Sequence, residues 1–280
     1  MNCFRYTRSY VGPVKACILD WSGTTVDKYV LAPAVVFVEL FKKYKVPISM
    51  EESRKPMGLR KDLHIAEITR MPSVIQRWQE VYGKKPTDND RAAMFKDFVP
   101  MQIAVLEKYG TVLPGTVQAV NQLRNELGCK IGVTTGFFRS MANVLQAEAK
   151  KQGFEPDVNV TGDEVENGAR PKPFMLYKNL DLLDIHTIQS VVKVDDTVSG
   201  IGEAQNAGCW GVGVACYSNY MDVDSLEHEQ QLTEEEMQER LVNSREILRK
   251  SGAHYVIDSI VELPEVVADI NSRLAKGEKP

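Results

Sequence analysis

Short apolar runs alternate with longer segments of helical spacing along most of this 280-residue chain. The apolar runs hold four to six residues, a length typical of buried strands in a parallel sheet. Six of them stand at residues 14–19, 130–134, 158–161, 191–194, 210–215 and 254–257. Segments with helical spacing lie between them, among them residues 117–127, 141–152 and 202–207. The alternation predicts an α/β fold with a doubly wound parallel sheet and helices on both of its faces.

A different pattern separates the first predicted strand from the second. Helical periodicity continues from residue 32 to 109 without a strand-like run, and the helical segments are expected at residues 33–44, 53–69, 73–82 and 88–106. We therefore predict two domains, an α/β core of residues 1–30 and 108–280 and an all-helical cap of residues 31–107. Such an insertion would lie over the strand ends as a lid, whose closure excludes water.

A charged helix is expected near the C-terminus, over residues 232–250. Thr233 and Glu236 have the spacing of a capping box, in which the threonine hydroxyl and the glutamate carboxylate each accept a backbone N–H. Many of the following positions carry charge, so this helix is predicted to lie on the surface.

Composition narrows the class of partner. Hydrophobic residues make up 43% of the chain, which is ordinary for a globular protein. Lysine and arginine total 34 against 38 acidic residues, a formal net charge of −4, so neither nucleic acid nor an anionic membrane is an expected partner. No run approaches the ~20 apolar residues of a membrane span, and no N-terminal segment resembles a signal peptide. The expected partner is a small molecule.

The cysteines and histidines do not form a metal or disulfide pattern. The five cysteines are odd in number and lack a CxxC pair, and Cys17 and Cys129 fall inside apolar runs. Buried, reduced thiols are therefore expected, which favours a cytoplasmic location. The four histidines are scattered without ligand spacing, which argues against a zinc site.

The first apolar run ends in Asp20, followed closely by Gly23, Thr24 and Thr25. The carboxyl end of a parallel strand faces the ligand crevice of an α/β sheet. A small turn with hydroxyls and free N–H groups suits a phosphate oxygen, so Asp20 is predicted to be functional, with Gly23 and Thr24 binding substrate. A structural acid that caps the next helix is the alternative.

Charge neutralisation is needed around a carboxylate that attacks phosphorus. The second core strand ends in Thr134, Thr135 and Gly136, which offer hydroxyl and backbone donors. Arg170 lies in a proline-flanked turn, where a cation could meet a phosphoryl oxygen, and the neighbouring Lys172 is an alternative. Either cation alone would more often be ordinary surface charge.

A second pair of acids ends another strand. Asp195 and Asp196 follow the apolar run at 191–194, so at least one carboxylate should reach the same sheet edge as Asp20. Carboxylates in this position could share a Mg²⁺ ion.

The ordered set of DxxGTT, TTG, a basic residue in a proline-flanked turn and DDT resembles the haloacid dehalogenase superfamily. That resemblance implies that Asp20 is the nucleophile. It also implies that Mg²⁺ is held by Asp20, by the main-chain carbonyl of Ser22 and by Asp196. Phosphatases and mutases of the superfamily usually carry a second aspartate at the place of Ser22, for proton transfer.

The segment DWSGTTVD, which contains Ser22, is similar to the phosphonoacetaldehyde hydrolases, a family within that superfamily. The segment RKPMGLRKDLH at residues 54–64 looks like the cap motif of that family, and GARPKPFMLYKN, DTVS and NAGCWGVGV extend the likeness over nearly the whole chain. The resemblance implies that Lys61 forms a Schiff base with a phosphonate aldehyde. Lys61 is the catalytic lysine on this interpretation, and a solvated helix lysine otherwise.

Schiff-base chemistry accounts for the missing acid. An imine on Lys61 takes up the electrons of a breaking C–P bond, so no acid is needed to protonate an ester oxygen. The amine must be neutral, which requires a lowered pKa, and we expect burial under the lid, the positive charge of Arg60 and, if it is protonated, that of His64 to supply it. His64 is expected either to assist catalysis or to pack, and Met57 to surround the substrate.

One position departs from the family. The family usually carries another acid four residues after Asp196, where this chain has Gly200, so water, Asp195 or Ser199 would have to complete the surroundings of the metal. Two other functions remain open: a related phosphatase or dehalogenase without imine chemistry, and a non-catalytic member that binds phosphate or phosphonate.

The resemblance also implies a homodimer. Apolar positions Ile75, Trp78 and Val81 in the predicted cap could face a partner or form the core of the cap itself.

Overall fold

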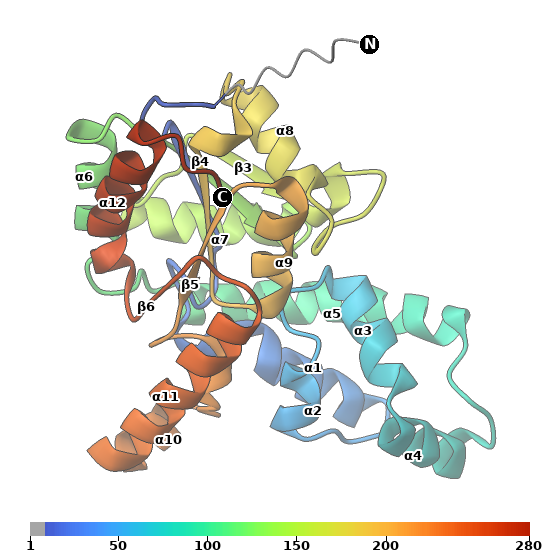
Figure 1. Cartoon of the computed structure of the whole chain (residues 1–280). Coiled ribbons are helices and arrows are strands. Elements are labelled where there is room, and N and C mark those ends of the chain that lie inside the picture. Colours follow the sequence, from blue (N-terminus) through green and yellow to red (C-terminus); the bar gives the residue numbers. More distant parts are fainter. Residues whose placement is uncertain (1–8) are drawn as a thin grey trace, which may run out of the picture.

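The computed structural model describes residues 9–280, in which six parallel strands form one sheet in the order β3-β2-β1-β4-β5-β6 (Figure 1). The strands are β1 (Ala16–Leu19), β2 (Lys130–Thr135), β3 (Val158–Thr161), β4 (Val191–Asp195), β5 (Trp210–Val214) and β6 (Tyr255–Ile257). All six predicted strands are confirmed. Cys3 and the start of the predicted core domain lie outside the described residues.

Helices cover both faces of this sheet, as predicted for a doubly wound fold. Side chains alternate along β1, so Cys17 and Leu19 face one hydrophobic cluster while Ala16 and Ile18 face another. The first face packs against α6 (Thr116–Asn125), α7 (Arg139–Lys151) and α12 (Leu263–Ala275). The second packs against α8 (Phe174–Leu182) and α9 (Val198–Ala207). Because both faces are buried, the strands read as continuous apolar runs.

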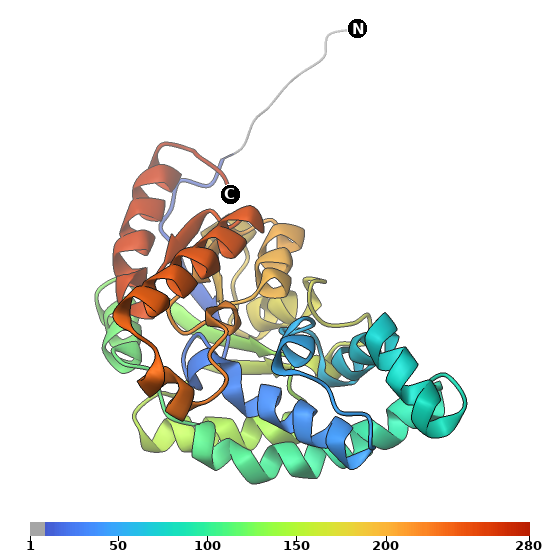
Figure 2. The ribbon, with the colours of Figure 1, turned by 90° about the horizontal axis from the view of Figure 1, so that it is seen from below.

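Five α-helices occupy the chain between β1 and α6, and we call them the helical insertion. They are α1 (Leu31–Lys43), α2 (Met50–Arg54), α3 (Lys61–Arg70), α4 (Pro72–Tyr82) and α5 (Asp88–Tyr109). They lie together at one end of the sheet (Figures 1 and 2). The helix expected over residues 53–69 is in fact two helices. Pro56 and Gly58, the latter with φ of 91°, form a turn between them, and α3 begins at Lys61.

The capping box predicted for the C-terminal helix is present. Thr233 and Glu236 exchange side-chain and backbone hydrogen bonds at the start of α11 (Glu234–Lys250), and α10 (Leu226–Gln231) precedes it. The helix is not wholly a surface element, because Leu241 and Leu248 are buried where α11 packs against the sheet.

The cysteines and the apolar insertion residues have defined places. Cys17 and Cys129 are buried free thiols, as expected. Trp78 is buried within the helical insertion beside Tyr82, whereas Val81 is 41% exposed. The apolar positions of α4 therefore divide between an internal and an exposed side. Over residues 9–280, the helices are too short or too polar to cross a membrane.

Candidate functional site

A small cavity, about 20 Å³ in volume, lies where the carboxyl ends of β1, β2 and β4 meet the helical insertion. The order of the strands explains its position. β1 lies between β2 and β4, the strand order changes direction there, and ligands of open α/β sheets bind at such a switch point. The predicted residues that line it are Asp20, Ser22, Met57, Lys61, Thr135, Gly136, Arg170 and Asp196. Val30, Gly58, Phe137 and Thr197, which the sequence did not single out, complete its wall.

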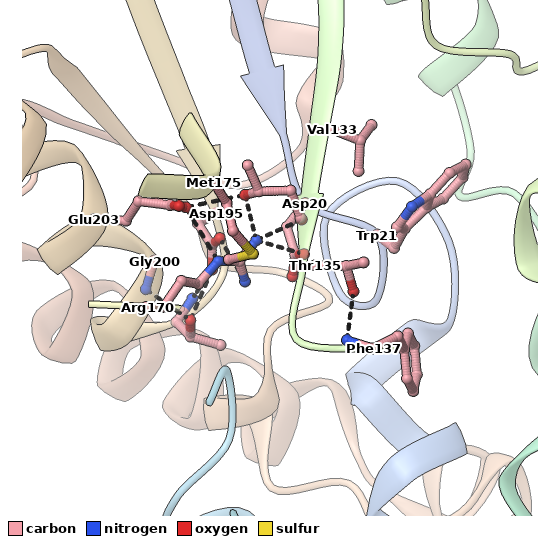
Figure 3. A network of polar contacts seen from close by, with 12 residues as sticks. Asp20, Trp21, Val133, Thr135, Phe137, Arg170, Met175, Asp195, Gly200 and Glu203 are labelled. Carbon is pink, nitrogen blue, oxygen red and sulfur yellow. Dashed lines mark hydrogen bonds and ion pairs between the residues drawn. The ribbon is translucent and has the colours of Figure 1, made fainter. Parts of the chain in front are cut away.

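Arg170 is the cation that reaches Asp20. Its Nη2 lies 2.9 Å from Asp20 Oδ1 and donates to the main-chain oxygen of Thr134 at 2.5 Å and to the Thr134 hydroxyl at 2.7 Å (Figure 3). The alternative, Lys172, is exposed and donates to the main-chain oxygen of Asn167, away from Asp20. Thr134 is fully buried and orients Arg170 from behind rather than lining the cavity.

A second set of charges lies deeper, beneath Arg170. Arg170 contacts Asp195 at 3.1 Å and Glu203 at 3.1 Å, and Lys193 contacts the same two acids at 2.9 and 3.6 Å. All of these side chains are buried, and Glu203 also accepts a 2.9 Å hydrogen bond from the Thr134 hydroxyl (Figure 3). The pairing of two cations with several carboxylates offsets the desolvation penalty of burying these charges. Glu203 and Lys193 were missed, although a lysine inside the apolar run of β4 was a usable signal.

The three carboxylates Asp20, Asp195 and Asp196 fit a divalent cation. One oxygen from each lies within 4.8 Å of the others. Asp196 Oδ2 accepts the N–H of Asn219 at 3.0 Å, but the buried Oδ1 has no hydrogen-bond partner among residues 9–280. Burial and the charges of Asp195 and Asp20 raise the pKa of Asp196 well above its ordinary value, a repulsion that a bound cation relieves. Such oxygen ligands suit Mg²⁺.

Lys61 is the first residue of α3 and is only 5% exposed. Its Nζ lies 4.8 Å from the ring centre of Phe137. Burial lowers the pKa of Lys61 to about 8, against the opposing charge of Asp20 and with help from Arg170. The positive end of the α3 dipole acts in the same direction. Burial was the expected cause, but Arg60 was not the right neighbour, because it pairs with Asp62 at 2.7 Å.

His64 lies beside Lys61 but does not line the cavity. It is fully buried, its ring stacks on Phe37 at 3.9 Å, and its Nε2 hydrogen-bonds the main-chain oxygen of Ser53 at 2.8 Å. Burial and the Lys61 charge hold the pKa of His64 well below its ordinary value, so the ring is neutral. It therefore does not supply the positive charge that would lower the pKa of Lys61. The contribution of His64 was conditional on its being protonated, and this condition is not met.

Gly23 and Thr24, which were expected to bind substrate, lie in the turn after β1 and outside the cavity wall. Gly23 has φ of 79°, and a Cβ built on it would come within 2.6 Å of the Asp196 carboxyl carbon. Glycine is therefore required for the turn to approach Asp196. Thr24 is fully buried, and the next residue, Thr25, donates its hydroxyl to the main-chain oxygen of Asp20 at 2.9 Å. This turn fixes the position of Asp20.

Arg54, at the end of α2, fastens the helical insertion to the rest of the site. Its Nη1 donates to the main-chain oxygens of Tyr29 at 2.8 Å and Asn219 at 3.2 Å, and its Nη2 donates to Val223 at 2.5 Å. Asn219 is the residue whose N–H holds Asp196. One buried arginine thus connects the insertion with the loop that orients a candidate metal ligand.

Known proteins resemble this chain over its full length. Residues 14–208 match the haloacid dehalogenase-like hydrolase family. A phosphonoacetaldehyde hydrolase from Syntrophobacter fumaroxidans is 38% identical over 280 residues, with 100% of both chains covered. One from Paraburkholderia phytofirmans is 42% identical over 268 residues, covering 95% of this chain and 99% of that relative.

Solved structures of known proteins are also similar to this chain. A phosphonoacetaldehyde hydrolase like protein from Oleispira antarctica has a TM-score of 0.95 at 35% identity, with 100% of both chains covered. A β-phosphoglucomutase from Clostridium difficile has a TM-score of 0.63 at 16% identity, covering 93% of this chain and 98% of that one. The second likeness concerns the fold alone.

Proposed function

The chain belongs to the haloacid dehalogenase-like hydrolases and, within them, to the phosphonoacetaldehyde hydrolase family, and from this membership we propose that it cleaves the C–P bond of phosphonoacetaldehyde to give acetaldehyde and phosphate. One observation carries the mechanism: Lys61 and Asp20 line the same small cavity, together with Ser22 in place of an acid. The cavity therefore offers an amine for the aldehyde and a carboxylate for the phosphorus.

In the first step, the Lys61 amine forms an imine with the substrate aldehyde. The neutral amine adds to the aldehyde carbon, and uptake of one proton from solvent with loss of water gives a protonated imine. The pKa of about 8 leaves roughly a tenth of Lys61 neutral at pH 7, far more than an ordinary lysine would supply. Phe137 forms an apolar wall beside Nζ and keeps the amine out of bulk water.

The second step belongs to Asp20. Its carboxylate attacks phosphorus, the C–P bond breaks, and the bonding electrons move into the imine to leave an enamine on Lys61. Water then hydrolyses the aspartyl-phosphate, and protonation of the enamine carbon followed by imine hydrolysis releases acetaldehyde. Because the leaving group is carbon activated by nitrogen, Ser22 need not donate a proton. Arg170 neutralises charge that develops on the phosphoryl oxygens.

Asp20, Asp196 and the main-chain oxygen of Ser22 would hold Mg²⁺ at the edge of this cavity. The unpartnered Oδ1 of Asp196 and the convergence of the carboxylates support this assignment. Bound Mg²⁺ supplies neutralising positive charge beside the phosphonate. His64 acts on Lys61 through packing, and Met57 closes the apolar side of the cavity.

Borohydride trapping tests the imine directly. Incubation with phosphonoacetaldehyde and borohydride should inactivate the enzyme and add a reduced two-carbon adduct to the peptide that contains Lys61. Lys61→Arg keeps the positive charge but cannot form the imine, so it should give no adduct and no turnover. An active wild-type enzyme without adduct, together with turnover by Lys61→Arg, would overturn the mechanism.

Substrate choice separates this function from its alternatives. We expect turnover of phosphonoacetaldehyde and at most slow release of phosphate from simple phosphomonoesters, because Ser22 cannot protonate an alkoxide. Equal rates on both substrates would indicate a phosphatase. Phosphate release from neither, with Mg²⁺ present, would indicate a binding protein.

Three further features belong to the proposal. The helical insertion acts as a cap on the core, the chain works in the cytoplasm, and it forms a homodimer. The exposed Val81 and Tyr82 of α4, at 41% and 42% exposure, are candidates for the dimer contact. Light scattering on wild type and on Val81→Glu would test the last point, since the charge should shift the enzyme towards a monomer.

A further inference from the structure

The Asp195 carboxylate fills the space that a side chain at position 200 would occupy. A Cβ built on Gly200 would overlap the carboxyl carbon and both carboxyl oxygens of Asp195. Gly200 belongs to the first turn of α9, whereas Asp195 is the last residue of β4 (Figure 3). The backbone of Gly200 itself permits a side chain, because its φ is not positive. The structure therefore accommodates a carboxylate from position 195 or from position 200, but not from both.

The Asp195 carboxylate binds several protein groups in this space. Oδ1 accepts the N–H of Thr197 at 3.0 Å and the Thr197 hydroxyl at 2.7 Å. Oδ2 lies 2.9 Å from Lys193 Nζ and 3.1 Å from Arg170 Nη1. Oδ1 is thus hydrogen-bonded and Oδ2 ion-paired within the protein, so Asp195, although it converges with Asp20 and Asp196, is already held by protein groups on both oxygens.

Ser199 does not share this role. Its hydroxyl lies 3.3 Å from the Thr197 hydroxyl, and a Cβ on Gly58 would overlap it. Ser199 therefore faces the turn between α2 and α3 rather than the carboxylates. The Asp196 Oδ1 atom, buried and without a partner, is the independent sign that a cation belongs beside Asp195.

We propose that Asp195 is a positioning residue that stands in for an acid at position 200. It fixes Arg170 and Lys193 from the strand end and supplies the negative charge next to the cation site, and the absence of a side chain at Gly200 makes room for it. This inference deepens the proposed function and rests on it for the identity of the cation, but it concerns only how this chain builds the surroundings of the site.

An exchange of the two residues tests the proposal. Asp195→Gly should weaken binding of Mn²⁺, used alone as a paramagnetic stand-in for Mg²⁺, by about tenfold or more, which is typical when an outer partner of a metal site is removed. Gly200→Asp alone should lower the Tm because two carboxylates then share one space. The double variant Asp195→Gly/Gly200→Asp should bring the Mn²⁺ Kd back to within about threefold of wild type.

Binding is measured by electron paramagnetic resonance and by competition with Mg²⁺, without substrate. Asp195→Asn keeps the shape and removes the charge, so it serves if Asp195→Gly does not fold, and it should also bind Mn²⁺ about tenfold more weakly. A double variant as weak as the single one, or Asp195→Gly and Asp195→Asn that bind like wild type, would overturn the proposal, as would a wild-type enzyme that binds no Mn²⁺. Failure of wild type to turn over phosphonoacetaldehyde would instead overturn the proposed function.

Discussion

Two buried lysines in this site have opposite surroundings. Lys193 lies within 2.9 Å of Asp195 and within 3.6 Å of Glu203, so two carboxylates compensate its charge. Lys61 contacts aromatic faces instead, and its pKa falls to about 8. A buried lysine needs either a partner or a lowered pKa. The first arrangement suits a structural cation, and the second suits a nucleophilic amine.

The pH dependence of turnover should follow the Lys61 amine. Because the neutral form attacks and the pKa is about 8, kcat/KM for phosphonoacetaldehyde should rise roughly tenfold per pH unit below 8 and level off above about 9. The measurement is a profile of initial rates from pH 6 to 9.5 at saturating Mg²⁺. A flat profile, or a rise that continues towards the ordinary lysine pKa of 10.5, would contradict the assignment.

Removal of the Lys193 charge should cost stability. Lys193→Met leaves Asp195 and Glu203 to share the single charge of Arg170, and breaking a buried pair in this way costs about 3–5 kcal/mol. Denaturant unfolding measures the loss. Lys172→Met is the matched control, because Lys172 is exposed and its replacement should change the free energy of unfolding by less than about 0.5 kcal/mol. Equal, small effects of both variants would show that the buried pair is dispensable.

At the scale of elements, the turn between α2 and α3 controls the site. Arg54 ends α2 inside the core, Gly58 passes against Ser199 and Thr197, and Lys61 starts α3 at the cavity. A side chain at Gly58 would collide with the core loop, so this close approach requires glycine. The break between the two helices, which the periodicity did not predict, thus places Lys61, the proposed imine-forming residue, at the cavity.

Arg54→Met should loosen this connection. It leaves the buried carbonyl oxygens of Tyr29 and Val223 without the Arg54 donor, each at a cost of about 1–3 kcal/mol, and it removes the hydrogen bond from Arg54 to the Asn219 loop that holds Asp196. We expect a lower Tm and, since the proposed metal ligand Asp196 also moves, a kcat reduced about tenfold or more at saturating substrate.

Arg70→Met is the control for that variant. Arg70 lies on α3 with its side chain 60% exposed, and it forms an ion pair with its helix neighbour Glu67, so its loss should leave kcat unchanged. If Arg54→Met lowers the Tm but retains the wild-type kcat, Arg54 is a structural residue without influence on Asp196.

The sequence was sufficient for some elements and not for others. Buried strands were recognisable because apolar runs ending in polar residues, such as the one before Asp20, are strong local signals. Helix boundaries and the inner charges were not, because Glu203 and Arg54 acquire their roles from partners far away in the chain. Thr134 was expected among the catalytic residues, and His64 was left open between a catalytic and a packing role. Neither lines the cavity, and only three-dimensional packing distinguishes residues of its wall from those behind it.

The cavity is too small for the proposed substrate, so the helical insertion must move before substrate can enter. The cavity volume of about 20 Å³ holds about one water molecule, so phosphonoacetaldehyde cannot enter while the helical insertion lies as it does. Two connections join the insertion to the sheet, before α1 and after α5, and residues of both line a larger cavity of about 340 Å³. The space between the connections gives them room to bend. Opening and closing of the insertion is therefore expected in each turnover.

A disulfide across the closed interface should stop that cycle. The Cβ of Arg60 lies 3.5 Å from a Cβ built on Gly162, within the range of disulfide geometry, and neither residue lines the cavity. We expect oxidised Arg60→Cys/Gly162→Cys to lose most of its turnover and to regain it on reduction, whereas each single variant should be indifferent to oxidant. Mass spectrometry of the cross-linked peptide verifies the bond. A fully cross-linked enzyme with undiminished kcat/KM would mean that substrate reaches Lys61 without movement of the insertion, by a route that the closed structure does not contain.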